Sequence, residues 1–171
     1  MARPAKPIPK LPADAPTVYV LVGVPASGKT TWYEKQVFKK ETVYVSTDTY
    51  IEKIALQEGK TYSEVFMDNM KDAIANMLLE VKSAHAEKKD IVWDQPSCSP
   101  RSRNKKFRLL KGYRFIAVVF PIPKLKVLNK RLKKRPGKTI PPFVMESMIS
   151  SFEMPTIEEG FHEIVIITAA V

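Results

Sequence analysis

The sequence contains few of the residues that build covalent cross-links or bind metals through sulfur. It has one cysteine, Cys98, and two histidines among 171 residues, so an internal disulfide is excluded. Neither histidine is placed to serve as a base for Cys98, which we therefore expect to be a packed thiol. No apolar run approaches the roughly 18 residues that a membrane-spanning helix needs. We expect a reducing, cytoplasmic setting.

Acidic residues are absent from one long stretch of the chain. Residues 101–138 contain fifteen lysines and arginines and no aspartate or glutamate, whereas the net charge of the whole chain is +10. The rest of the chain is therefore acidic on balance. A nucleotide needs only a few cations, so the excess in segment 101–138 favours a polyanionic partner, most simply DNA. The alternative is a basic face that only keeps the protein soluble.

The first sixteen residues lack the apolar core of a signal peptide or membrane anchor. They include five prolines, which predicts an extended, flexible arm over residues 1–16. Residues 17–171 are expected to form a single domain with a sizeable core, because 44% of the chain is hydrophobic.

One glycine-containing loop carries the strongest functional signal. Residues 23–30, GVPASGKT, fit G-x-x-x-x-G-K-[ST] after an apolar strand at 18–22 and before a glycine-free segment at 29–40 that can be helical. Such a loop cradles phosphates with its backbone N–H groups. We expect Lys29 to reach the β/γ-phosphates of ATP and Thr30 to hold Mg²⁺. The predicted phosphate-binding residues are Gly23, Pro25, Ala26, Ser27, Gly28, Lys29, Thr30 and Thr31.

Strands and helices alternate after this loop, which predicts an α/β fold: a P-loop NTPase-type parallel five-stranded sheet with helices on both faces and a helical lid. We expect strands at 18–22, 42–45, 91–93, 114–120 and 163–168, and helices at 29–40, 50–58, 62–88, 99–112 and 124–134, with a last helix beginning at 141–142.

Local sequence patterns indicate where one of the predicted helices begins and which sides of two helices face the core. Thr61 and Glu64 fit a capping box at the start of the long helix. Its apolar stripe, and the leucines of the basic helix at 124–134, are expected to face the core. These residues are Phe66, Met70, Ile74, Met77, Leu78 and Val81 in the first helix, and Leu125, Leu128 and Leu132 in the second.

Two aspartates follow predicted strands. Asp48 comes just after the strand at 42–45, and Asp94 just after the strand at 91–93. Ligands of open α/β sheets bind at the carboxyl ends of the strands. One carboxylate could accept the proton of an attacking hydroxyl and the other could hold Mg²⁺. The alternative for each is a helix N-cap, most plausibly for Asp48.

A basic break between two predicted helices has the composition of a mobile lid. Pro136 and Gly137 interrupt the segment KKRPGK at 133–138. Closure of such a lid, near residues 131–141, would bring Arg131 and Arg135 onto the triphosphate and exclude water. The alternative is a plain basic loop.

The chain resembles the phage polynucleotide kinase family of P-loop kinases from about Val18 to Thr168. The matching motifs are G-x-P-x-S-G-K-T-T-W at 23–32, Asp48-x-Tyr50, the strand ending in Asp94, K-R-x-x-K-x-x-P at 134–141, and the segment PTIEEGF at 155–161. The resemblance implies that Lys29, Asp48, Asp94 and Arg135 are catalytic, with Asp48 as general base. A phage-encoded chain would act in the host cytoplasm.

One position departs from that family. An arginine normally follows the tyrosine, but this chain has Ile51, and its nearest cation is Lys53. A related phage group phosphorylates the hydroxymethyl group of 5-hydroxymethyluracil in DNA, and the altered acceptor site favours that activity over phosphorylation of 5′-hydroxyl ends. The remaining alternatives are a small-molecule P-loop kinase and a nucleotide-gated DNA-binding module.

Overall fold

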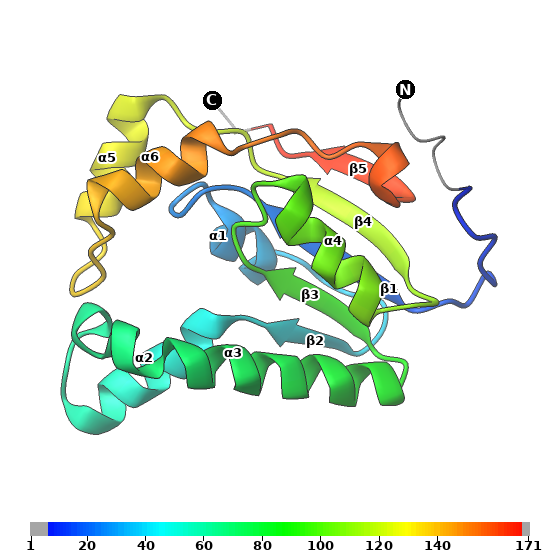
Figure 1. The fold of residues 1–171 in the computed structure, drawn as a ribbon, viewed down its shortest axis with the longest axis horizontal. Helices are drawn as coiled ribbons and strands as arrows, with labels where there is room; N and C mark the ends of the chain where they lie inside the picture. The colour runs from blue at the N-terminus through cyan, green and yellow to red at the C-terminus, as the bar shows by residue number, and fades with distance from the viewer. Residues whose placement is uncertain (1–6, 169–171) are drawn as a thin grey trace.

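The computed structural model describes residues 7–168 and contains one five-stranded parallel sheet (Figure 1). The strand order is β2-β3-β1-β4-β5, and every neighbouring pair is parallel. The central strands β3, β1 and β4 are mainly apolar in their interiors because helices cover both of their faces. The expected fold class is confirmed. The strands are β1 (Thr17–Val22), β2 (Thr42–Val45), β3 (Asp90–Asp94), β4 (Arg114–Val119) and β5 (Glu163–Ile166).

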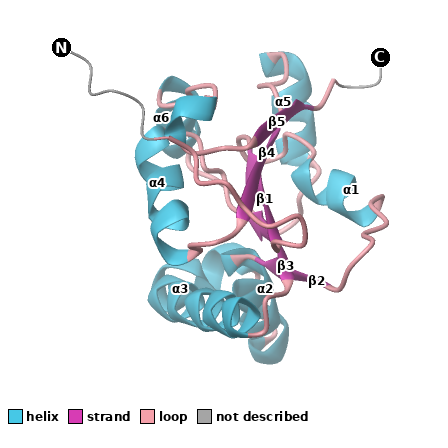
Figure 2. Cartoon of the chain, turned by 90° about the vertical axis from the view of Figure 1, so that its right-hand side faces the viewer, coloured by secondary structure: helices cyan, strands magenta, loops and turns pink. Residues whose placement is uncertain are grey.

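Helices lie on both sides of this sheet, as Figure 2 shows with the strands seen nearly end-on. Met77, Val81 and Leu110 pack with β1, β3 and β4 on one face. On the opposite face, Trp32 and Tyr33 pack against Leu21 and its neighbours. The helices are α1 (Lys29–Glu34), α2 (Thr47–Glu58), α3 (Tyr62–Ala86), α4 (Pro100–Leu109), α5 (Leu125–Lys133) and α6 (Pro142–Ser150), with a short 3₁₀ helix at Ile157–Glu159.

Helix α1 is much shorter than the predicted 29–40 helix. It ends at Glu34, and the amide of Gln36 donates to the carbonyl of Tyr33 in a tight last turn. The ring of Phe38 lies 5.4 Å from that of Tyr19 and 6.0 Å from that of Tyr33. Burial of this aromatic side chain against the sheet turns the chain back and outweighs helix propensity.

Helix α2 begins three residues before the predicted 50–58 helix. The hydroxyl of Ser46 accepts from the amide of Asp48 at 3.2 Å, so Ser46 is the N-cap. The alternative role of Asp48 as the N-cap of this helix is therefore excluded. Because Ser46 satisfies the helix end, the carboxylate of Asp48 is available for other contacts.

Helix α3 has the predicted capping box of Thr61 and Glu64 but ends two residues before Lys88. Its buried stripe differs from the predicted one: Met77 and Val81 are buried, whereas Ile74 and Leu78 are 41% and 39% exposed. The helix covers the β2–β3 edge of the sheet, so one narrow side is buried and its flanks are not. The buried residues of α3 are Val65, Ala73, Met77, Val81 and Ala84.

Other boundaries differ by a few residues. Helix α4 ends at Leu109, before the turn at Gly112, and β5 ends at Ile166, before Thr168. In α5, Leu128 is buried but Leu125 is 67% exposed, so the prediction that Leu125 faces the core is wrong. Leu125 is the first residue of α5, a helix that lies beyond the end of the sheet in Figure 1. None of the helices within residues 7–168 is long and apolar enough to cross a membrane.

Part of the predicted arm, residues 1–6, lies outside the described residues. The end of the arm contacts the sheet: the carbonyl of Pro16 accepts from the amide of Arg114 at 2.8 Å, and Ala15 is buried.

Candidate active site

The P-loop connects β1 to α1 at the carboxyl edge of the sheet, as the sequence predicts. Ala26 and Gly28 have φ values of +64° and +108°, the left-handed conformation that turns successive N–H groups inward. A Cβ on Gly23 would lie 2.5 Å from the Ser27 hydroxyl and 2.9 Å from the Cβ of Phe120, so only glycine fits there. The buried Ser27 hydroxyl has no hydrogen-bond partner among the described residues. Thr30 and Thr31 are exposed.

Lys29 is folded back onto its own loop. Its ammonium group donates to the carbonyls of Gly23 at 3.0 Å and Val24 at 3.1 Å. Burial lowers the pKa of Lys29; the charges of Asp94 and Asp48 oppose that shift, and Arg135 adds to it. The electrostatic influence of all three residues on Lys29 indicates that the four predicted catalytic residues converge on one site.

Asp94 is buried at the end of β3. In the β1–β3 pairing it lies opposite Leu21, two residues before Gly23, so its carboxylate adjoins the P-loop. The hydroxyl of Tyr44 donates to Oδ2 of Asp94 at 2.6 Å. Burial, followed by the charge of Asp94, raises the pKa of Tyr44, so Tyr44 stays a proton donor at neutral pH.

The donors around Asp94 fit the predicted Mg²⁺ site. Mg²⁺ in kinases is held by one or two protein oxygens together with substrate phosphates and water. The carboxylate of Asp94 and the exposed hydroxyl of Thr30 supply oxygens of that kind. Within residues 7–168, no cluster of three or more His, Cys, Asp or Glu side chains is preassembled for a metal.

Asp48 lies in the first turn of α2, just past the end of β2. Its Oδ1 accepts from the hydroxyl of Tyr62 at 2.7 Å, and its Oδ2 accepts from Lys138 at 2.6 Å. Burial opposes ionisation of Asp48, but Lys138, Tyr62 and Arg135 outweigh it and hold its pKa below the ordinary value. Asp48 is therefore ionised at neutral pH, as a general base must be.

The predicted lid near residues 131–141 includes the end of α5 and the loop before α6, and this loop contacts α2 and α3. The amide of Ser63 donates to the carbonyl of Gly137 at 3.0 Å, and the amide of Thr139 donates to the Ser63 hydroxyl at 2.8 Å. Lys138 also lies 4.2 Å from the ring centroid of Tyr62. These contacts hold the loop against Asp48.

The two predicted lid arginines face the P-loop side. Arg131 donates from Nη1 to the carbonyl of Ala26 at 3.2 Å. Nη1 of Arg135 is buried without a hydrogen-bond partner among the described residues. An unpaired guanidinium nitrogen near Lys29 and Asp48 is a donor suited to a phosphate oxygen.

Sequence reasoning did not assign roles to Lys138, Tyr62 or Tyr44. Lys138 belongs to the K-R-x-x-K-x-x-P motif, which could have identified it. No sequence motif indicates a functional role for Tyr62 or Tyr44, because tyrosine is common at the start of a helix and inside a strand. Only the fold brings each of them to an aspartate.

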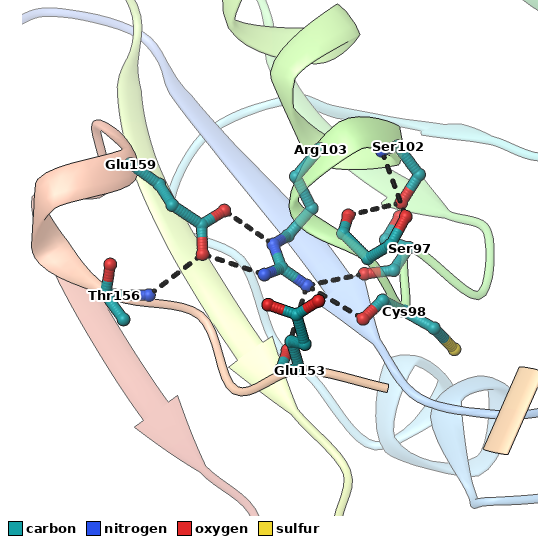
Figure 3. Close-up of polar contacts among 8 residues, drawn as sticks. Ser97, Cys98, Ser102, Arg103, Glu153, Thr156 and Glu159 are labelled. Atoms are coloured by element: carbon teal, nitrogen blue, oxygen red, sulfur yellow. Dashed lines mark hydrogen bonds and ion pairs between the residues drawn. The ribbon is translucent and has the colours of Figure 1, made fainter. Parts of the chain in front are cut away.

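The loop that follows Asp94 is held in place by a fully buried arginine of α4 (Figure 3). Arg103 donates to both carboxylate oxygens of Glu159, at 2.8 and 2.7 Å. Its Nη1 donates to the carbonyls of Ser97, Cys98 and Glu153 at 3.0, 3.2 and 3.1 Å. Arg103 thus ties the β3–α4 loop to the segment after α6.

This arrangement corrects one expectation about the basic segment 101–138. Arg103 and Lys106 are 0% and 4% exposed, so two of its fifteen cations cannot lie on a surface that contacts DNA. Cys98 in the same region is buried, as expected, and burial raises the pKa of its thiol.

Comparisons with known proteins agree with this fold. A family model described as an AAA domain matches residues 18–155. A structure of the Pnkp1/Rnl/Hen1 RNA repair complex superposes with a TM-score of 0.61 at 22% identity over 80% of this chain, which spans only 43% of that protein. Chaetomium thermophilum Kti12 in complex with ADP-AlF3 has a TM-score of 0.60 at 16% identity, covering 89% of both chains.

A gluconokinase from Sinorhizobium meliloti has a TM-score of 0.52 at 20% identity, covering 89% of this chain and 82% of its own. The family match extends from β1 through the P-loop, both aspartates and the lid. The chain therefore belongs to the AAA domain family and has the P-loop kinase fold.

Proposed function

We propose that this protein is an ATP-dependent kinase that transfers the γ-phosphate to a hydroxyl group on DNA, with the hydroxymethyl group of 5-hydroxymethyluracil as the preferred acceptor. The observation that carries the proposal is the position of Asp48, an ionised carboxylate beneath the lid and near Lys29. A protein that only binds nucleotide has no need of such a base.

In this reaction Asp48 accepts the proton of the acceptor hydroxyl as that oxygen attacks the γ-phosphorus. The bond between the γ-phosphorus and the β–γ bridging oxygen breaks, and ADP leaves with that oxygen. Lys29 and Arg135 stabilise the charge on the transferred group. Mg²⁺ held by Thr30 and Asp94 would neutralise phosphate charge when bound.

Two features support the choice of acceptor. Apart from Arg103 and Lys106, the predicted DNA-binding segment includes exposed cations of α4 and α5 such as Arg101 and Lys130, which suit a polyanion. Ile51 is fully buried with Ala55 and Val65, so the position where the resembling family has its arginine holds an apolar core side chain. That favours an acceptor other than a 5′-terminal nucleotide.

The test is transfer of label from γ-radiolabelled ATP to four acceptors: DNA with internal 5-hydroxymethyluracil, 5′-hydroxyl DNA, 5′-hydroxyl RNA and gluconate. We expect label on the modified base. Asp48→Asn should reduce transfer by about 100-fold or more, because general-base catalysis contributes at least that factor. Asp72→Asn, an exposed change on α3, is the matched control and should retain activity.

Every other distribution of label among the four acceptors would lead to a different conclusion. Label on 5′ ends alone would replace the modified base with a terminal hydroxyl as acceptor, and label on gluconate alone would identify a small-molecule kinase. Binding of ATP and DNA without any transfer would overturn the kinase assignment in favour of a nucleotide-gated binding module.

A further inference from the structure

An open cavity of about 270 Å³ begins at Gln95, the residue after Asp94, and none of Lys29, Asp48 and Arg135 lines it. Its walls come from the β3–α4 loop, from α4 and from α6, and they include Gln95, Ser97, Lys106, Met148 and Ser151. The cavity therefore adjoins the candidate site through Gln95, which follows Asp94 in the chain. No lining residue is an aspartate or glutamate.

Lys106 is a buried cation without a counterion. It is 4% exposed, and its ammonium group contacts only neutral groups: Gln95 Oε1 at 3.2 Å, the Ser102 carbonyl at 3.5 Å and the Trp93 ring, whose centroid is 4.9 Å away. None of the ion pairs among residues 7–168 includes it. An isolated buried charge is costly, and an anionic ligand would offset that cost.

The charged groups that act on the ammonium group of Lys106 are both cations. Burial, followed by the charges of the neighbouring cations Arg103 and Lys105, lowers the pKa of Lys106 to about 8. Arg103 is already neutralised by Glu159, so Lys106 is the group left to meet an anion.

Two neutral donors face the same cavity. The carbonyl oxygen of Gln95 accepts from Trp93 Nε1 at 3.0 Å and from Lys106, which leaves the amide –NH₂ of Gln95 without a protein partner among the described residues. The Ser97 hydroxyl is buried and unpartnered. Ser97 has φ +49°, and Arg103 fixes its carbonyl (Figure 3).

We propose that this cavity binds a phosphate group of the acceptor, with Lys106, the Gln95 amide and the Ser97 hydroxyl as its donors. This inference rests on the proposed polynucleotide acceptor. Three convergent donors suit a tetrahedral oxyanion, and a phosphodiester supplies one at every nucleotide. Occupation would hold the acceptor chain next to Asp94, and so orient its hydroxyl for transfer.

The first test does not depend on activity. The titration of the Lys106 ammonium group is followed by NMR in ¹³C-lysine-labelled protein, with the P-loop filled by ADP, in the presence of thymidine 3′-monophosphate or thymidine. We expect the monophosphate to raise the pKa of Lys106 by about one pH unit, as a nearby opposite charge does, and thymidine to leave it unchanged. The exposed Lys82 is the internal reference. An unchanged pKa with both compounds would overturn the proposal.

The second test uses the phosphorylation assay. Lys106→Gln should raise the KM for the accepted oligonucleotide about tenfold, since a hydrogen bond to a charged group is lost, while the KM for ATP stays within twofold. Lys82→Gln should change neither. If Lys106→Gln fails to fold, Ser97→Ala removes one donor only and should raise the same KM severalfold.

The two proposals fail in different ways. If the monophosphate shifts Lys106 but no polynucleotide is phosphorylated, the phosphate site stands and the acceptor assignment fails. If polynucleotides are phosphorylated but Lys106→Gln, Ser97→Ala and Lys82→Gln give the same KM, the cavity does not bind the acceptor.

Discussion

Replacing Lys138 with methionine removes the ion pair between the lid and Asp48 while keeping most of the side-chain volume. The distance between Lys138 Nζ and Asp48 Oδ2 is only 2.6 Å, but the pair is partly exposed to solvent. The side chains of Lys138 and Asp48 are 14% and 44% exposed. Solvent therefore screens it, and we assign it about 1 kcal/mol. That is equivalent to about 0.7 of a pH unit in the pKa of Asp48, which should rise toward its ordinary value in Lys138→Met.

The expected pH dependence follows from the direction in which folding shifts the pKa of Asp48. Because folding lowers the pKa of Asp48, its ionised form contributes stability above the unfolded pKa of about 3.9, and that contribution is lost as the pH falls through the folded pKa. In Lys138→Met the acidic limb of kcat/KM should move to higher pH, and less stability should be lost on acidification.

The assay is NMR titration of the Asp48 carboxyl carbon in both proteins, with a pH–rate profile beside it. Lys134→Met is the matched control, since Lys134 is exposed on the same lid and makes none of the ion pairs found in the described residues. The reasoning is refuted if Lys138→Met and Lys134→Met give the same Asp48 pKa, or if that pKa falls.

Three further predictions concern other parts of the site. Lys29→Met should weaken ATP binding at least tenfold, measured by calorimetry, because the phosphates lose their P-loop cation. Arg103→Met should cost about 3 kcal/mol, since it removes the buried partner of the Glu159 carboxylate and three hydrogen bonds to backbone carbonyls. That corresponds to a Tm lower by roughly 10 °C, whereas exposed Arg101→Met should change the Tm little. Raising salt from 50 to 200 mM should lower kcat/KM for an oligonucleotide about tenfold if two phosphates are contacted; an unchanged value would argue for a small, weakly charged acceptor.

Local sequence signals predicted the elements that depend on neighbouring residues. The P-loop and the capping box of Thr61 and Glu64 both depend on contacts within a few residues, and both are present. Errors arose where a distant contact competed with local preference. The early end of α1 depends on Phe38 reaching Tyr19, and the exposure of Leu125 depends on where α5 projects from the sheet.

By itself, the sequence determined the fold class, the phosphate cradle at 23–30 and the candidates Asp48 and Asp94, because spacing along the chain and strand polarity are sufficient for these. Only the tertiary structure decided which side chains surround each candidate. Lys138 and Tyr62 meet Asp48 from 90 and 14 residues away. The sequence suggests that Arg103 and Lys106 are surface cations, but both are buried. The cost of burying a charge depends on its surroundings in space, which no local pattern encodes.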